Sequence, residues 1–215
     1  MARTKSTRST RSAGRPTSED VLEIENMLIE AALEEFLEHG YGSASLDRVV
    51  KRARVSKTTL YSRYASKEEL FRAIVYQQIN RINPASLLQV DSRSFSLEEG
   101  LKSYANTMLE LNLKGEMLGV NRLINSESGR FPELGTAAAE RTQLGIDRIS
   151  RFIADCAKSD GIPCRAPDSV ARAFILMIRG WYTHILLTNQ KVTKTQRQRW
   201  VEEAVHVLVS SRRDW

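Results

Sequence analysis

The spacing of apolar residues along this chain is that of α-helices. Between Glu19 and Gly40, apolar positions recur every three to four residues, as on one helix face, at Val21, Ile24, Leu28, Ala31, Ala32 and Phe36. Gly40 and Gly42 predict the end of this first helix. Because strand-like alternation persists nowhere in the sequence, we expect an all-α fold.

Two short helices are predicted next. Ser45 opens the first, and a break at Arg54 leads to Ser56, a good N-cap for the second. Ser66, with Glu69 three residues further on, forms a capping box for a longer helix. Two short helices joined by a tight turn and braced by longer ones describe a helix-turn-helix, so a three-helix domain is expected over residues 19–65.

The rest of the chain, residues 66–215, is predicted to form a helical bundle. A loop is expected over 83–95, and Ser96 with Glu99 makes a capping box for the helix beyond it. Further helices are expected over about 116–125, 132–161, 168–188, with Asp168 as cap, and 195–211. The segment 168–188 is apolar nearly all round, which predicts burial on more than one side.

Charge is sorted by segment along the chain. The net charge is +6 and the isoelectric point about 9.5, which favours a polyanionic partner. Residues 1–18, including Arg15, are basic and almost free of apolar side chains, which predicts a disordered arm. From Arg48 to Lys67 there are seven basic residues and no carboxylate. A solvated helix face and a solubilising tail are the alternative interpretations of these runs.

The second short helix has the features of a DNA reader. Its leading turn is small and polar, as entry into the major groove requires, so we expect Lys57 and Thr58 to contact bases and Arg63 a base or a phosphate. Tyr61 is expected on a phosphate and Tyr64 mostly in the core. The predicted DNA-binding residues are Arg15, Ser45, Arg48, Ser56, Lys57, Thr58, Thr59, Tyr61, Arg63, Tyr64 and Lys67.

These segments resemble a known family. Residues 31–41 (AALEEFLEHGY), Ser45-Leu46, residues 55–61 (VSKTTLY) and residues 66–70 (SKEEL) look like the DNA-binding signature of the TetR/AcrR repressors. Residues 130–134 (RFPEL) and Arg179-Gly180 resemble the AefR-like subset of regulatory domains. The resemblance implies an Ω-shaped homodimer with a ligand cavity in each C-terminal body. It also implies dimerisation through the last two helices, about 168–188 and 195–211.

The sequence departs from the family's usual pattern in the helix-turn-helix. Arg54 stands where Gly is usual, Val50 where a small Ala is usual, and Ala65 where Pro is common. If the turn requires a positive φ at Arg54, the arginine costs roughly 1 kcal/mol of stability while adding a charge near DNA.

The predicted ligand-binding residues lie on inward faces of the C-terminal helices. They are Tyr104, Met108, Leu111, Leu123, Phe174, Met177, Trp181 and His184. Each has ordinary core packing as its alternative, but together they favour a small hydrophobic or aromatic effector. No charged pair stands out among them.

The expected function is that of a ligand-responsive regulator, most simply a repressor that an effector releases from a palindromic operator. A DNA-organising or protein-recruiting factor on the same scaffold is the alternative. An enzyme is disfavoured because the sequence shows no nucleophile–base pair and no phosphate-binding glycine loop.

Cofactors, metals and membranes are not expected. Cys156 and Cys164 match no zinc-ligand spacing, and the three histidines are scattered. The longest apolar run, Ala173–Ile178, is too short for a membrane span, and the basic N-terminus is no secretory signal. A cytoplasmic protein is therefore expected.

Overall fold

The computed structural model describes residues 18–81, 87 and 95–215. All regular structure within these residues is helical, which confirms the all-α fold. The basic arm, with Arg15, and most of the loop expected over 83–95 lie outside the described residues.

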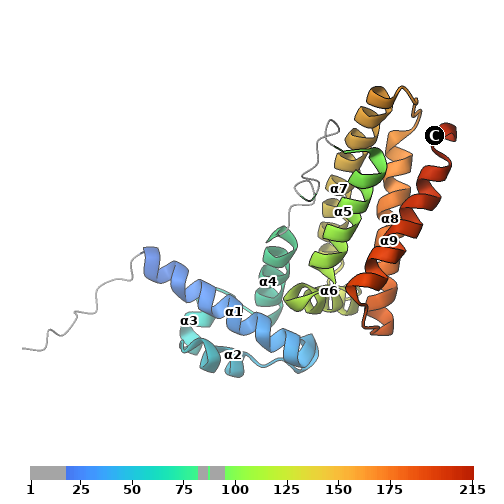
Figure 1. The fold of residues 1–215 in the computed structure, drawn as a ribbon. Coiled ribbons are helices and arrows are strands. Elements are labelled where there is room, and N and C mark those ends of the chain that lie inside the picture. The colour runs from blue at the N-terminus through green and yellow to red at the C-terminus, as the bar shows by residue number, and fades with distance from the viewer. Residues whose placement is uncertain (1–17, 82–86, 88–94) are drawn as a thin grey trace, which may run out of the picture.

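The N-terminal helices form the predicted helix-turn-helix (Figure 1). Helix α1 (Ser18–Ser43) packs across α2 (Leu46–Ala53), which is followed by α3 (Lys57–Tyr61) and α4 (Lys67–Arg81). The backbone of α1 is interrupted at Gly40, where φ is 68° and ψ is 170°. Glycine adopts this conformation without the steric cost that a side chain would add, so the predicted break is present, with one more turn after it.

The C-terminal body is a helical bundle. It contains α5 (Leu97–Asn112), α6 (Gly115–Glu127), α7 (Pro132–Asp160), α8 (Pro167–Thr188) and α9 (Lys194–Ser210). Helices α5, α7, α8 and α9 run side by side, and α6 lies across their base, next to the N-terminal helices (Figure 1).

The helix caps confirm some predictions and correct others. The Ser96–Glu99 capping box is present at the start of α5. Helix α8 begins one residue before Asp168, whose carboxylate instead accepts a hydrogen bond from the Ser150 hydroxyl of α7. Helix α9 begins with an unpredicted capping box between Thr193 and Gln196.

Buried apolar side chains gather in two cores. The first fills the bundle and includes Leu101, Phe152 and Phe174, all essentially inaccessible to solvent. The second joins α1 to α4 and also takes in residues of α6 and of the start of α7, namely Val120, Leu123, Phe131 and Leu134. The N-terminal core therefore continues across residues 65/66, where the sequence predicts the domain boundary.

Aromatic rings connect the N-terminal domain to α7. The Phe131 ring lies 5.1 Å from both the Tyr41 and Phe71 rings, and Phe36 lies 5.0 Å from Phe71. We call these four residues the aromatic joint. The Arg130 guanidinium covers the Tyr41 ring at 4.7 Å. The RFPEL segment thus attaches the body to the helix-turn-helix.

Two ion pairs flank the aromatic joint. Arg130 pairs with Glu68 at 3.1 Å, and Arg72 pairs with Glu133 at 2.6 Å. Both pairs link α4 to the start of α7 or to the residues just before it.

Helix α8 is apolar beyond what the core requires. By length and composition it could cross a membrane, and 44% of its most apolar window is buried. Leu176 and Leu187 on its outer face are 53% and 74% exposed.

Candidate nucleic-acid interface and effector cavity

The leading turn of α3 is held rigidly by its own cap. The Ser56 hydroxyl accepts a hydrogen bond from the Thr59 backbone N–H at 3.0 Å, and the two hydroxyls lie 2.8 Å apart. Leu60 is completely buried and anchors the helix to the domain. Lys57 and Thr58 are therefore presented to solvent on a fixed backbone.

The turn between α2 and α3 requires a left-handed residue. Arg54 has φ 56° and ψ 35°, and its backbone N–H caps the carbonyls at the end of α2. The sequence predicted a cost for arginine if this position needed a positive φ, and it does. The Arg54 side chain is exposed at the turn.

Lys57 has an intramolecular partner. Its ammonium lies 2.7 Å from the Asp47 carboxylate at the start of α2, and both side chains are mostly exposed. The hydrogen bond to Asp47 raises the pKa of Lys57. Any contact of Lys57 with DNA must replace this pair, whose exposure makes the exchange inexpensive.

The two tyrosines of this region have different environments. Tyr61 is 51% exposed beside the leading turn, as a phosphate contact requires. Tyr64 is buried in the N-terminal core, and burial, the largest cause, raises its pKa. The Arg63 guanidinium donates to the Val21 carbonyl at 3.4 Å, so this side chain lies against α1.

Glu35 organises the start of α2 from within the core. Its Oε1 accepts hydrogen bonds from the Ser45 backbone N–H at 2.9 Å and from Arg48 Nε at 2.8 Å. Although burial raises the pKa of Glu35, these hydrogen bonds outweigh it and hold the pKa below its usual value. The Ser45 hydroxyl itself caps nothing in the free protein.

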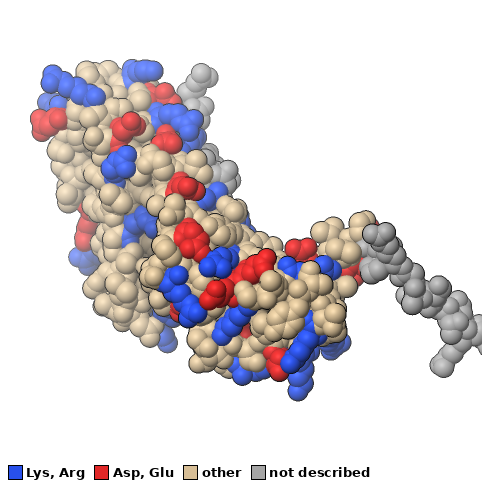
Figure 2. Space-filling view, turned by 180° about the vertical axis from the view of Figure 1, so that it is seen from behind, with Lys and Arg blue, Asp and Glu red and all other residues tan. Residues whose placement is uncertain are grey.

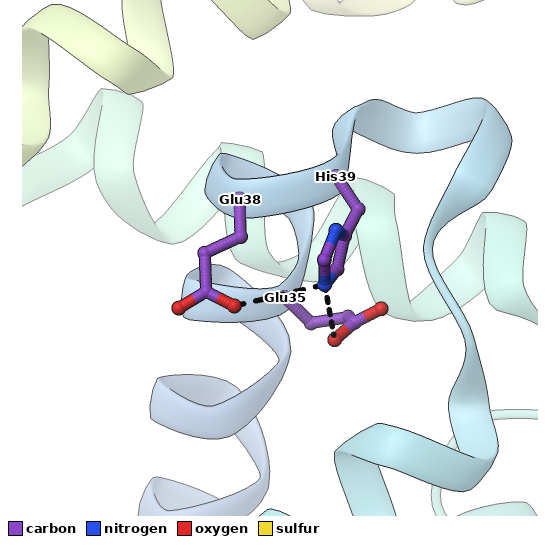
Figure 3. Close-up of side chains that lie close together, drawn as sticks. All are labelled: Glu35, Glu38 and His39. Carbon is purple, nitrogen blue, oxygen red and sulfur yellow. Dashed lines mark ion pairs between the residues drawn. The ribbon is translucent and has the colours of Figure 1, made fainter.

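Glu35, Glu38 and His39 lie close together in α1 (Figure 3). His39 Nε2 is 3.7 Å from a carboxylate oxygen of each glutamate. The three could in principle hold a metal ion, but Arg48 pairs with Glu35 and Arg52 with Glu38 at 2.6 and 2.9 Å. The arginines already neutralise both carboxylates, so the cluster is an ion-pair network that braces α1 against α2.

Lys67 is half-buried at the start of α4. Its ammonium donates to the Ala44 and Gly42 carbonyls at 2.6 and 3.1 Å and lies 4.8 Å from the Tyr41 ring centre. Burial lowers its pKa. Two of its three N–H donors are used inside the protein, which leaves one for a phosphate.

Basic side chains gather at the outer edge of the N-terminal domain, away from the C-terminal body (Figure 2). Lys51, Arg54 and Lys57 are exposed in α2, in the turn and in α3. Among the described residues, Lys51 and Arg54 have no ion-pair partner within 4 Å. Their charge is available to a polyanion, and the sequence-based list of contacts omitted both.

A small cavity of about 90 Å³ lies in the C-terminal body, between the end of α4 and helices α5, α7 and α8. The side chains that line it are Ile79, Leu87, Tyr104, Met108, Asn112, Arg141, Thr142, Ile175 and Arg179. Of the eight predicted ligand-binding residues, the structure places Tyr104 and Met108 here. Periodicity alone gave no sign of Arg141 and Arg179.

The other six predicted ligand-binding residues lie elsewhere. Phe174 is completely buried in the bundle core, and Leu123 belongs to the core shared with the helix-turn-helix. Leu111 and His184 are exposed. Met177 packs against the bundle core, and Trp181 stacks on Trp200 with ring centres 4.5 Å apart.

A second hollow, open to solvent, lies between α1, α4 and α6. Its volume is about 650 Å³, and its lining is largely polar, including Glu30, Glu34, Gln77 and Arg81. Sites for small ligands are typically enclosed and lined by apolar side chains, and this hollow is neither.

A capped, exposed α3 behind a tight turn, on a domain joined to a helical body, defines a helix-turn-helix DNA-binding regulator. Comparison with known proteins shows to which family of helix-turn-helix regulators the chain belongs. A profile of bacterial regulatory proteins of the tetR family matches residues 28–74, and one of the AefR-like transcriptional repressor C-terminal domain matches residues 99–211. The chain belongs to the TetR family, whose members are transcriptional regulators and not enzymes.

Individual relatives agree with this assignment. The HTH-type transcriptional regulator YhgD of Bacillus subtilis is 27% identical over 70% of this chain and 77% of its own length. The A-factor receptor protein of Streptomyces griseus is 29% identical over 43% of this chain, and the match spans only 36% of that protein.

Solved structures share the fold along most of the chain. The Flavonoid-responsive Regulator FrrA superposes with a TM-score of 0.64 and 27% identity, covering 88% of this chain and 96% of FrrA. The transcriptional regulator FadR from Bacillus subtilis, solved in complex with stearoyl-CoA, has a TM-score of 0.63 and 17% identity, covering 86% of this chain and 98% of FadR.

Proposed function

We propose that this protein is a homodimeric repressor that a small-molecule effector releases from an inverted-repeat operator. The observation that carries the proposal is the position of the cavity: Ile79, near the C-terminal end of α4, lines it, while Leu70 and Phe71 of the same helix lie in the helix-turn-helix core. One continuous helix thus connects the cavity of the C-terminal body to the helix-turn-helix.

The DNA contacts follow from exposure and charge. In this proposal Lys57 and Thr58 enter the major groove, while Tyr61, Lys51 and Arg54 contact phosphates. Ser56 and Thr59 hold the leading turn. Tyr64 supports the fold from within the core, Arg48 supports it through its ion pair with Glu35, and Lys67 offers its remaining N–H donor to the backbone of DNA.

The outer face of α8, together with α9, is the proposed dimer interface. Leu176, His184 and Leu187 are exposed along one side of α8, and a Cβ added at Gly180 would meet nothing within 4 Å. The absence of a side chain at Gly180 lets a partner helix approach closely. Val207 of α9 is 69% exposed and is included in the proposed interface. A second copy would cover it.

The effector acts in this proposal by favouring one arrangement of the body. If binding changes the position of α4, the two α3 helices no longer match successive major grooves, which lie about 34 Å apart in B-DNA. A hundredfold loss of operator affinity requires only about 2.7 kcal/mol of coupling. The relatives named for flavonoids and bound to stearoyl-CoA support an effector with an apolar part.

The test begins with operator selection from a random DNA library using the full-length protein. We expect an inverted repeat, bound by two subunits. Lys57→Ala and Thr58→Ala should weaken binding to that operator by about tenfold or more and relax specificity at individual bases. Equal loss on operator and random DNA would contradict the base contacts, and failure to select an inverted repeat would contradict the repressor model.

A further inference from the structure

Two arginines line the cavity. They are Arg141 of α7 and Arg179 of α8, and none of the other described residues in its lining carries a carboxylate. Among the described residues, neither arginine has an ion-pair partner within 4 Å. The charge that the described residues bring to this cavity is therefore positive.

Two nitrogens of the Arg141 guanidinium lack hydrogen-bond acceptors. The Nε and Nη2 atoms are buried and donate to no group among the described residues. Buried donors on a charged group cost far more free energy when unpaired than when an anion accepts from them. Nε and one terminal nitrogen are also the pair of donors with which arginine binds a carboxylate in a bidentate manner.

The remaining polar groups of the lining suit the same ligand. Burial, only partly offset by Arg179, raises the pKa of Tyr104 to about 12, so its phenol stays protonated and can donate a hydrogen bond. One N–H of the Asn112 amide is engaged with the Met108 carbonyl, and Thr142 donates to Ala138. The donors that remain come from Tyr104, Arg141, Arg179 and the second N–H of Asn112.

Apolar side chains complete the cavity. Ile79, Leu87, Met108 and Ile175 come from α4, from the segment after it, from α5 and from α8. They provide contacts for a hydrocarbon or aromatic part of a ligand, next to the two arginines. The volume of about 90 Å³ accommodates an acid head with a short apolar segment, so a longer body would have to displace side chains.

We propose that the effector is an amphipathic organic acid whose carboxylate is bound by Arg141 and Arg179 while its apolar body lies against Ile79 and Met108. This inference rests on the proposed ligand-responsive function and adds the chemical class of the ligand. It replaces the sequence-based expectation that no charged pair defines the site.

The experiment uses matched acids and amides on the full-length protein. Hexanoate, decanoate and phenylpropanoate are titrated calorimetrically beside their primary amides. We expect the acids to bind about tenfold or more tightly than the amides, because charge-assisted hydrogen bonds are the stronger ones.

Arg141→Gln and Arg179→Gln should reduce acid affinity to the level of the amide and leave amide affinity unchanged. Arg151→Gln, exposed on the same helix α7, is the matched control and should change neither.

Thermal unfolding without ligand separates a binding role of Arg141 from a structural one. Because Arg141→Gln removes a charged group with two buried donors that have no acceptor among the described residues, we expect its melting temperature to equal or exceed that of the wild type. A clear drop, equal affinity for acid and amide, or no acid binding would overturn the inference. If neutral flavonoids release the operator while acids do not, the anion site is wrong and the repressor model stands. If the full set of acids, amides and flavonoids leaves operator binding unchanged, both fail.

Discussion

Basic side chains of the helix-turn-helix divide into those that build the domain and those that remain for a partner. Arg48 and Arg52 are engaged by Glu35 and Glu38, while Lys51 and Arg54 are exposed without such partners. The sequence identified the run of positive charge but could not separate the two groups. The glutamates that engage the arginines lie ten or more residues upstream, and only the packing of α1 on α2 brings them together.

Asp47 restrains Lys57 in the free protein, so Asp47→Asn should increase DNA affinity. The substitution releases the Lys57 ammonium and removes a negative charge near the phosphates. We expect a gain of roughly threefold to tenfold at low salt, measured by fluorescence anisotropy. Melting temperature should barely change, since exposed pairs contribute little. The double variant with Lys57→Ala is the control, and persistence of the gain in it would contradict this explanation.

Glu35 should make the stability of the N-terminal domain sensitive to acid. Its folded-state pKa is lowered, so its contribution is complete above the unfolded pKa of about 4.5 and is lost as the pH falls through the folded value. Glu35→Gln should cost about 1 to 3 kcal/mol at neutral pH. In urea unfolding from pH 7 downward, the free energy of unfolding should fall less steeply with pH for the variant than for the wild type. Parallel curves for the two proteins would contradict this role.

At the scale of elements, sequence-based prediction succeeded where local chemistry determines the backbone. The Ser96–Glu99 and Ser56 caps and the turn at Arg54 depend on neighbouring residues, and the structure contains all three. Asp168 was expected to cap α8 but instead accepts from Ser150 of α7. Ser150, which is distant in sequence, takes the place of the local capping interaction of Asp168. The spacing of apolar residues contains no information about such a partner.

The left-handed turn at Arg54 predicts opposite effects on stability and affinity. Arg54→Gly should raise the free energy of unfolding by about 0.5 to 1 kcal/mol, because glycine adopts a positive φ freely. It should also weaken DNA binding and reduce the slope of log affinity against log salt by about one. Arg54→Ala keeps the strain and removes the charge, so it should lose affinity without gaining stability. Unchanged affinity in both variants would exclude a phosphate contact.

Close packing of α5 on α7 depends on Gly100. A Cβ there would lie 2.2 and 2.5 Å from ring carbons of Phe152, a fully buried side chain. Gly100→Ala should therefore cost about 1 to 3 kcal/mol by chemical denaturation. Gly135→Ala, where a Cβ meets nothing, should instead stabilise α7 by about 0.5 to 1 kcal/mol. Adding Phe152→Leu to Gly100→Ala should recover part of the loss, and failure to do so would point to another cause.

At the scale of the whole molecule, the exposed leucines of α8 determine the expected assembly. Leu187→Glu should convert the dimer into a monomer in sedimentation velocity and weaken operator binding by more than tenfold, since one subunit reaches only one half-site. Leu144→Glu is the matched control, because Leu144 of α7 is 44% exposed outside the proposed interface. A wild-type protein that sediments as a monomer would contradict the arrangement.

The effector cavity shows what sequence alone could not provide. Tyr104 and Met108 were identified because inward-facing residues of a bundle are candidates for any internal site. Arg141 and Arg179 were not, since a charge on a helix is ordinarily solvated. Their meeting at one cavity depends on the register between α7 and α8, which no residue pattern within either helix specifies.

The core shared by α1–α4, α6 and the start of α7 has a consequence for engineering. A chimeric biosensor that transplants residues 18–81 onto a foreign sensor body would leave behind Val120, Leu123, Phe131 and Leu134. The graft would expose the former neighbours of these four residues to water. A functional chimera must therefore include α6 and the RFPEL segment together with the N-terminal helices. The unit that folds around this core is discontinuous in sequence.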